Sequence, residues 1–291
     1  MVKIYASIAL WAIAVIFVFY DGQKIIEKPP VAKAGLKFVI AMSLVGAKGT
    51  YSVVVKNLKT GEEYAFNEEK IYHAGSLYKL WIMAEAYSQI QAGILTKEEI
   101  LSQTIPELNN EFNIASEGAE LVEGVITFST QDALSQMITI SHNYAALLLT
   151  EKVKLSRTKA FLDNYGFHAS TIAVEGEPPA TSASDIALFF EKLYKEQLAN
   201  KQYTNEMLTL LKKQQLNNKL PKQLPTGTVI AHKTGELGSF SHDGGIVFSS
   251  KGDYIIVVLS DTDYPPGAEE RIAQISKAVY DYFANKPADT N

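Results

Sequence analysis

The sequence predicts an α+β fold in which segments from both ends of the chain complete one antiparallel sheet. Alternating apolar residues near the N-terminal end predict two strands, at residues 51–58 and 62–67. Three further apolar runs predict strands near the C-terminal end, at residues 228–232, 244–249 and 254–260. The region between them, residues 76–220, has mainly helical patterns. Strands at both ends with helices between them indicate one sheet that closes around an inserted helical region.

The remaining elements follow in chain order. Residues 36–45 carry apolar side chains at helical spacing, and Lys-Thr-Gly at 59–61 lies between the first two strands as a hairpin turn. Ser182, with Asp185 three residues later, predicts a capping box before a helix. An amphipathic helix at 267–284 closes the chain.

One domain, 35–288, therefore contains both parts of the fold. We expect a sheet lobe from residues 35–70 and 225–288, and a helical lobe from 71–224. We expect a monomer.

Composition limits the possible functions. The chain has 291 residues, a net charge of -5 and no cysteine, so thiolate chemistry and disulfides are excluded. No basic stretch with interleaved aromatic residues occurs, which argues against a nucleic-acid partner. The five histidines have no zinc-ligand spacing in a helix, and we expect neither a metal nor a cofactor.

The N-terminal segment predicts a membrane association. Ile4–Tyr20 is a run of 17 residues without a charge, which spans about 25 Å as a helix. We expect residues 1–22 to form an uncleaved anchor, with the domain at 35–288 on the extracytoplasmic side. A cleaved signal peptide, which would give a secreted protein, is the alternative. Residues 23–34, with two adjacent prolines, predict a stiff linker.

Three short polar motifs occur in a fixed order. They are Ser-Leu-Tyr-Lys at 76–79, Ser-His-Asn at 141–143 and Lys-Thr-Gly at 233–235. The chain also contains a second Ser-x-x-Lys at 156–159 and the second Lys-Thr-Gly of the hairpin turn. Ser156 is expected to cap a short helix that ends near Gly166. Context therefore separates the three motifs from these decoys, because the middle motif lies between two helical patterns and the last lies on a strand.

The motifs together carry the groups needed for acyl transfer through a serine ester. If Ser76 opens a helix, Lys79 lies one turn later on the same face and can act as its base. A lysine base must be neutral, which requires burial or a neighbouring cation such as Lys233 to lower its pKa. Ser141 would relay a proton to the leaving nitrogen.

The other motif residues are expected to bind the substrate. Asn143 would hold an amide carbonyl, while Lys233 and Thr234 would hold a carboxylate. Gly235 lets the substrate backbone lie close to the strand. The backbone N–H groups of Ser76 and Glu236 would form an oxyanion hole.

The chain resembles the class A β-lactamases and the related penicillin-binding proteins from about residue 35 to the C-terminal helix. Residues around the motifs take part in the resemblance, as in His-Ala-Gly-Ser at 73–76, Ser-His-Asn-Tyr-Ala-Ala at 141–146 and His-Lys-Thr-Gly at 232–235. The resemblance implies a five-stranded antiparallel sheet flanked by helices, beside an all-helical lobe. It also implies the same catalytic roles for Ser76, Lys79, Ser141 and Lys233, and the same binding roles for Asn143 and Thr234.

The chain departs from the family pattern in three places. His142 replaces the usual aspartate of the middle motif. The arginine that often helps to hold the substrate carboxylate is absent from 244–246, since the chain has only Arg157 and Arg271. The loop that carries the family's deacylating glutamate is short, at 171–181, and offers Glu175, which we favour, or Glu177.

Two main functions follow from the resemblance. A β-lactamase would open a β-lactam ring and release it from the serine. A DD-carboxypeptidase or transpeptidase would act on peptidoglycan stem peptides and be trapped by the drug. A non-hydrolytic sensor that only binds the β-lactam is the third possibility. We expect the β-lactamase.

Overall fold

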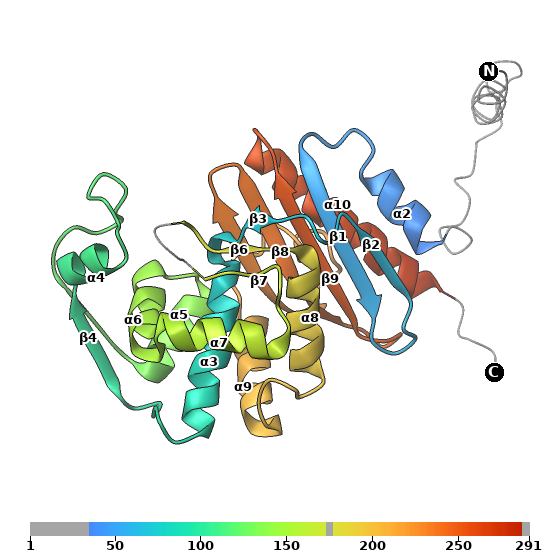
Figure 1. Cartoon of the computed structure of the whole chain (residues 1–291). Helices are drawn as coiled ribbons and strands as arrows, with labels where there is room; N and C mark the ends of the chain where they lie inside the picture. The colour runs from blue at the N-terminus through green and yellow to red at the C-terminus, as the bar shows by residue number, and fades with distance from the viewer. Residues whose placement is uncertain (1–34, 173–176, 287–291) are drawn as a thin grey trace, which may run out of the picture.

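The computed structural model describes residues 35–172 and 177–286 (Figure 1). The predicted anchor and linker lie outside these ranges, as does Glu175. No helix within the described ranges has the length and apolar character needed to cross a membrane.

A five-stranded antiparallel sheet forms the centre of the molecule, in the order β2-β1-β9-β8-β7. Its strands are β1 (Thr50–Asn57), β2 (Glu63–Phe66), β7 (Val229–Leu237), β8 (Phe240–Phe248) and β9 (Tyr254–Asp261). The last strand of the chain thus pairs with the first, which confirms the prediction that distant segments complete one sheet. The predicted hairpin turn is also confirmed: Gly61 has φ +74°, and the Asn57 side chain accepts from two turn N–H groups.

Each face of the sheet is covered by helices (Figure 1). Helices α2 (Leu36–Ser43) and α10 (Pro265–Asn285) cover one face, where β1, β8 and β9 side chains pack against them. Helix α8 (Ala183–Tyr194) covers the other face. It packs closely because Gly244 has no side chain: a Cβ there would lie 2.9 Å from Ile186 Cγ2. This second face shares its core with the helical region, so the two parts of the fold are joined by one apolar cluster.

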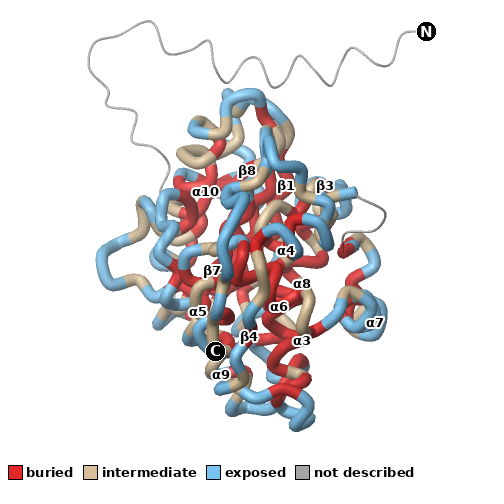
Figure 2. The backbone as a smooth tube through the Cα atoms, turned by 90° about the vertical axis from the view of Figure 1, so that its left-hand side faces the viewer, coloured by how far each residue is buried: buried red, intermediate tan, exposed pale blue. Residues whose placement is uncertain are grey.

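The helical region is built around α3, which is buried along nearly its whole length (Figure 2). Its helices are α3 (Lys79–Gln91), α4 (Ile105–Glu111), α5 (Thr130–Thr139), α6 (Asn143–Val153), α7 (Leu155–Tyr165) and α9 (Lys201–Lys212). The apolar residues of α3 fill the centre of the larger core cluster. Three polar residues of α3 are buried as well: Lys79, Glu85 and Gln89.

The expectation of an all-helical lobe is wrong in part. β4 (Ile100–Thr104) pairs with β5 (Val125–Ser129), and β3 (Tyr72–His73) pairs with β6 (Ala180–Thr181). These two-stranded sheets are short and lie beside helices, so their alternation is hard to detect in sequence. The boundaries of the two lobes stay a prediction.

The capping predictions had different outcomes. The Ser182 hydroxyl accepts from the N–H of Asp185, which confirms the cap of α8. The prediction for Ser156 is wrong, because α7 begins at Leu155 and the N-cap residue is Lys154, with φ +73°. Ser156 is exposed within the first turn, and Lys159 pairs with Asp163, so this decoy motif lies on the outer surface of a helix.

Candidate active site

Ser76 lies in a short 3-10 helix, η2 (Gly75–Tyr78), that leads directly into α3. Two glycines allow this turn to lie very close to β7. A Cβ on Gly235 would lie 2.7 Å from the carbonyl oxygen of Ala74, and a Cβ on Gly75 would lie 2.6 Å from the backbone nitrogen of Glu236. The missing side chains therefore let the nucleophile's turn approach the strand closely. This close approach is a structural role for Gly235 in addition to the predicted contact with substrate.

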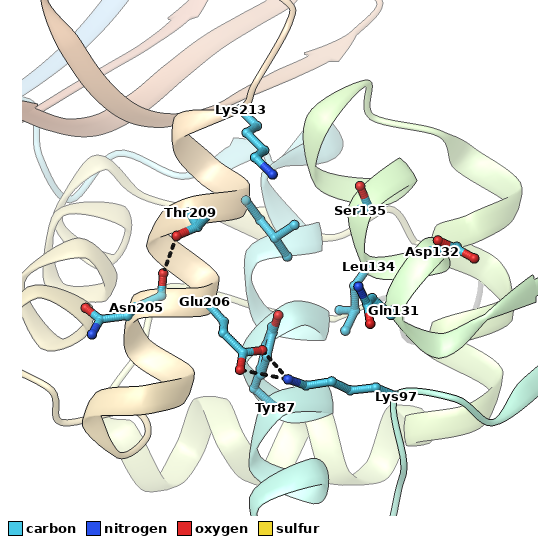
Figure 3. Close-up of a pocket in the computed structure, with 11 residues that line it drawn as sticks. Tyr87, Lys97, Gln131, Asp132, Leu134, Ser135, Asn205, Glu206, Thr209 and Lys213 are labelled. Carbon is cyan, nitrogen blue, oxygen red and sulfur yellow. Dashed lines mark hydrogen bonds and ion pairs between the residues drawn. The ribbon is translucent and has the colours of Figure 1, made fainter.

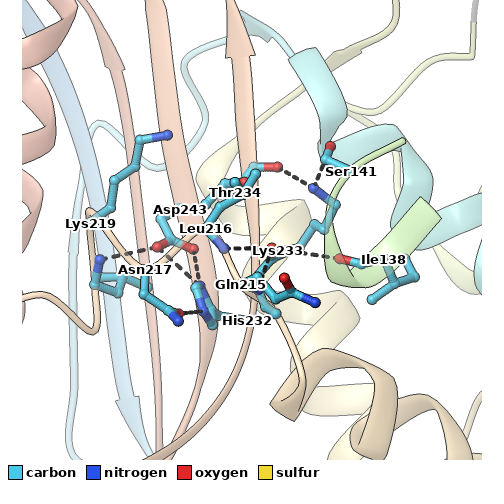
Figure 4. Close-up of polar contacts among 12 residues, drawn as sticks. Ile138, Ser141, Gln215, Leu216, Asn217, Lys219, His232, Lys233, Thr234 and Asp243 are labelled. Carbon is cyan, nitrogen blue, oxygen red and sulfur yellow. Dashed lines mark hydrogen bonds and ion pairs between the residues drawn. The ribbon is translucent and has the colours of Figure 1, made fainter. Parts of the chain in front are cut away.

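Ser141 occupies the tight loop between α5 and α6, as predicted. Its φ of +60° is unusual for a non-glycine residue and is a conformation that clusters at functional sites. Its hydroxyl lies 3.2 Å from Lys79 Nζ and 3.0 Å from Lys233 Nζ. Figure 4 shows the contact with Lys233, which reaches Ser141 from the sheet. The hydroxyl of Ser141 is thus held between two lysine amines from different parts of the fold.

Lys79 is fully buried and is held by the middle motif. Besides the Ser141 hydroxyl, its Nζ donates to the backbone oxygen of Ser141 at 2.7 Å and to Asn143 Oδ1 at 2.6 Å. Burial lowers the pKa of Lys79 to about 7, and the negative charge of Glu120 opposes this shift. Half of the lysines are then neutral near pH 7, as a general base requires.

The contact between Ser76 and Lys79 stays a prediction. Among the described residues, no hydrogen bond joins the Ser76 hydroxyl to Lys79, whose three contacts are those that an ammonium group makes. Loss of its proton would free Lys79 from at least one of these acceptors.

Lys233 is also fully buried, and its Nζ donates to the carbonyl oxygen of Thr234 at 2.8 Å. Its pKa is lowered well below the usual value, first by burial and then by the charge of Lys79. Burial is also the main cause for Lys79. The sequence left two possible causes for a lowered pKa of Lys79, namely burial and a neighbouring cation such as Lys233. Burial is the larger of the two.

His142 takes a supporting position at the start of α6. Its Nδ1 accepts from the N–H of Ala145 at 3.2 Å, so the imidazole caps the helix in place of an aspartate. The ring packs edge-on against Phe128, with 5.7 Å between centroids. Burial lowers the pKa of His142, and the charge of Lys79 adds to this shift while Glu120 opposes it. The neutral ring that the cap requires is therefore favoured.

Two charged residues at the site were not predicted from the sequence. The first is Glu120, on the loop between α4 and β5, whose Oε1 accepts from Asn143 Nδ2. Nothing in its local sequence distinguishes it from the other glutamates of this loop. Its position depends on contacts between residues distant in the chain, so only the folded structure identifies it.

The second is Lys219, which lies beside the third motif (Figure 4). Its side chain is 0% exposed, and its Nζ lies 2.6 Å from Glu236 Oε1. The backbone of this loop is held by Asp243, which accepts from the N–H of Leu220 and from His232 Nδ1. Arg271 donates to the backbone oxygen of Ser43, at the end of α2. Lys219 supplies a buried cation beside Glu236, the residue that follows the Lys-Thr-Gly motif.

Two of the cavities in the described part of the chain are lined by the helical region. A polar hollow of about 440 Å³ lies between α3, α5 and α9, where Lys97 pairs with Glu206 (Figure 3). A less polar cavity of about 560 Å³ is lined by Tyr78 of the first motif and by the exposed Glu177. Of the two candidate deacylation carboxylates, Glu177 is thus near the nucleophile's helix, and Glu175 is outside the described residues.

A five-stranded antiparallel sheet beside a helical region, with serine and lysine motifs where they meet, is the architecture of the serine β-lactamases and penicillin-binding proteins. The chain belongs to the beta-lactamase enzyme family, whose family model matches residues 36–283.

Solved structures with the same fold include both classes. PBP-A is 20% identical, with 86% of this chain and 95% of that chain covered and a TM-score of 0.73. A β-lactamase from Sphaerobacter thermophilus is 20% identical, with 87% and 98% covered and a TM-score of 0.75. One from Chitinophaga pinensis is 18% identical, with 84% and 98% covered and a TM-score of 0.74. At these identities the likeness establishes the fold. A comparison with curated proteins gave no match.

Proposed function

We propose that the protein is a serine hydrolase that opens β-lactam rings through an acyl ester on Ser76. The observation that carries the proposal is the position of the Ser141 hydroxyl, within 3.2 Å of Lys79 Nζ and 3.0 Å of Lys233 Nζ. A hydroxyl between two lysines with lowered pKa values can pass a proton in either direction.

Acylation of Ser76 would begin with a proton transfer. Neutral Lys79 takes the proton of the Ser76 hydroxyl as the oxygen attacks the lactam carbonyl. The backbone N–H groups of Ser76 and Glu236 stabilise the oxyanion, which is typically worth about 3–4 kcal/mol for one donor. When the ring C–N bond breaks, the Ser141 hydroxyl gives its proton to the leaving nitrogen and takes up the proton that Lys79 removed from Ser76. The product is an ester on Ser76.

Three groups of the third motif region would hold the substrate carboxylate. Lys233 and Thr234 face it from β7, and Lys219 adds a second buried ammonium beside Glu236. We propose that Lys219 takes the part that an arginine takes in many relatives, since a cation at the end of the cleft attracts the same anion.

Hydrolysis of the ester requires a base that activates water. We propose a carboxylate of the short loop, Glu175 or Glu177, for this role. Glu177 and Tyr78, of the first motif, line the same cavity. This position favours Glu177 over Glu175 as the base.

A penicillin-binding peptidase is the second candidate. Two observations favour it: the loop at 171–181, where the family carries its deacylating glutamate, is short, and PBP-A shares the fold. A mutant form of PBP-A, 21% identical to this chain, is solved as an acyl-enzyme with penicillin G. In such an enzyme the drug ester would persist, and a peptidoglycan peptide would be the substrate.

Incubation with a chromogenic cephalosporin, followed by colour and by intact protein mass, separates the candidates. Continuous turnover supports the β-lactamase. One equivalent of colour with a lasting adduct supports the peptidase or a sensor, and no adduct contradicts the serine ester. Ser76→Ala should abolish the reaction. Ser156→Ala, in the decoy motif, is the matched control and should leave the reaction unchanged.

We also propose that residues 1–22 anchor the protein in a membrane, with the catalytic domain on the extracytoplasmic side. The support is the uncharged run Ile4–Tyr20, together with a substrate class that is found outside the cytoplasm. Fractionation of cells that express the full chain, with and without this run, tests the anchor.

A further inference from the structure

The amide group of Asn143 has a hydrogen-bonding capacity that acylation alone does not explain. Its oxygen accepts from Lys79 Nζ, and its nitrogen donates to Glu120 Oε1. A primary amide nitrogen carries two hydrogens, so one N–H is committed to Glu120 and the other remains for the carbonyl oxygen of the substrate's amide. The substrate carbonyl and the Glu120 carboxylate would therefore share one NH₂ group.

The loop that carries Glu120 is held by Tyr144, the residue that follows Asn143. The hydroxyl of Tyr144, which is 2% exposed, donates to the backbone oxygen of Leu121 at 2.7 Å and accepts from its N–H at 3.1 Å. Asn109 Nδ2 donates to the same backbone oxygen at 2.9 Å. These hydrogen bonds attach the loop to the start of α6. The Glu120 carboxylate is thereby held next to Asn143, the residue that it contacts.

We propose that Glu120 is a specificity-determining residue that selects substrates with an ammonium group on the carbon next to the side-chain amide carbonyl. This inference rests on the proposed function, because it assumes that the substrate's amide oxygen binds to Asn143.

The geometry follows from hydrogen-bond lengths. Two acceptors on one NH₂ group, each about 2.9 Å from the nitrogen, lie roughly 4–5 Å apart. A substituent on the carbon next to the carbonyl then lies within hydrogen-bond reach of the carboxylate. An ammonium there gains an ion pair with Glu120, whereas a carboxylate there is repelled. Glu120 is exposed, so solvent weakens both effects, and we expect a difference of about tenfold between the two charges.

The test compares three penicillins that differ only at this carbon: benzylpenicillin, its α-amino derivative and its α-carboxy derivative. The second-order rate constant of acylation is measured by intact mass at pH 6.5, where the α-amine is largely protonated. We expect the wild type to react about tenfold faster with the amino than with the carboxy compound. Glu120→Gln keeps an oxygen for Asn143 Nδ2 but removes the charge, and should reduce this ratio to near one.

Two controls separate local from general effects. Glu117→Gln removes the same charge from an exposed position of the same loop and should keep the wild-type ratio. Tyr144→Phe loosens the loop that carries Glu120, so it should lower the ratio while acylation by benzylpenicillin continues.

The outcomes distinguish failure of the subsite from failure of the proposed function. Adducts with all three compounds, at an amino-to-carboxy ratio that is the same in wild type and Glu120→Gln, overturn the subsite alone. The same result follows if Glu117→Gln lowers the ratio as much as Glu120→Gln. Absence of an adduct with every compound overturns the proposed function, and the subsite with it.

Discussion

The burial of Lys79 determines how the acylation rate should depend on pH. Its pKa of about 7 means that the neutral, basic form is lost below neutrality. The acylation rate constant is therefore expected to rise about tenfold per pH unit below pH 7 and to level off above it. Stopped-flow measurement with benzylpenicillin from pH 5 to 9 tests this. A rate that is independent of pH from 5 to 8 would show that the lysine is not the base.

Lys219 should affect binding and stability in opposite ways. Replacement by Met keeps the volume of the buried side chain, removes a buried charge and leaves the partner Glu236 in water, since it is 56% exposed. Stability in denaturant should stay the same or rise. Acylation by a carboxylate-bearing β-lactam should fall about tenfold or more if the ammonium binds that group. Lys212→Met, on α9, is a control that removes a lysine away from the motifs. A Lys219→Met variant that loses stability but acylates normally contradicts this role.

At the level of single residues, the sequence predicts the residues of the catalytic motifs better than it predicts which other side chains lie beside them. The three motifs were found because each has a characteristic spacing and a suitable context. Glu120 and Lys219 were missed because each reaches the site through contacts with residues more than 15 positions away in the chain. The Ser156 cap was wrong because Lys154, with a positive φ, is the N-cap residue, and the helix therefore starts two residues earlier than predicted.

At the level of elements, the packing of η2 on β7 sets the position of Ser76. Gly235→Ala introduces a Cβ that meets the Ala74 carbonyl oxygen at 2.7 Å and Leu77 Cγ at 2.9 Å. We expect a loss of stability of about 1–3 kcal/mol and at least a hundredfold loss of acylation, because the nucleophile's turn must move away from the strand.

A second glycine provides the control for this prediction. Gly61→Ala also replaces a glycine, but at a hairpin with φ +74° and no atom within 4 Å. It should cost about 1 kcal/mol of stability from backbone strain and leave acylation unchanged. Denaturant unfolding and the acylation rate, measured on both variants, check the pair. Equal losses of acylation in the two would mean that stability alone, rather than the position of η2, is responsible.

The elements that the sequence predicted are those with long regular patterns. The five strands, α8 and α10 were each indicated by alternation, by a cap or by helical spacing, and their ends differ by a few residues from the predicted ones. The pair β4 and β5 was missed, since a ribbon of five-residue strands buries few side chains and leaves a weak pattern.

At the level of the whole molecule, the buried His242 should make stability depend on pH. Its Nδ1 accepts from the N–H of Ser260, and its Nε2 donates to the backbone oxygen of His73, so the ring is neutral. Burial lowers the pKa of His242 to about 4. Because an unfolded chain binds this proton near pH 6.5, stability should fall as pH drops from 6.5 to 4, by on the order of 3 kcal/mol.

Urea unfolding at pH 7 and pH 4.5 tests this dependence. Carboxyls with raised pKa values, such as those of Glu85 and Asp185, act in the opposite direction, so the comparison is made between variants. His242→Gln should flatten the loss of stability, and His168→Gln, at an exposed position, should keep it. An unchanged pH dependence in His242→Gln would assign the effect to other groups.

The two lobes meet at the candidate active site. There the turn that carries Ser76 packs against β7, beside the buried side chains of Lys79 and Lys233. The most direct test is the site of covalent attachment after a short incubation with benzylpenicillin. Proteolysis and mass spectrometry should find the added mass on Ser76 in the wild type, with no adduct in Ser76→Ala and a normal adduct in Ser156→Ala. An adduct on another residue, or one that persists in Ser76→Ala, would contradict the account.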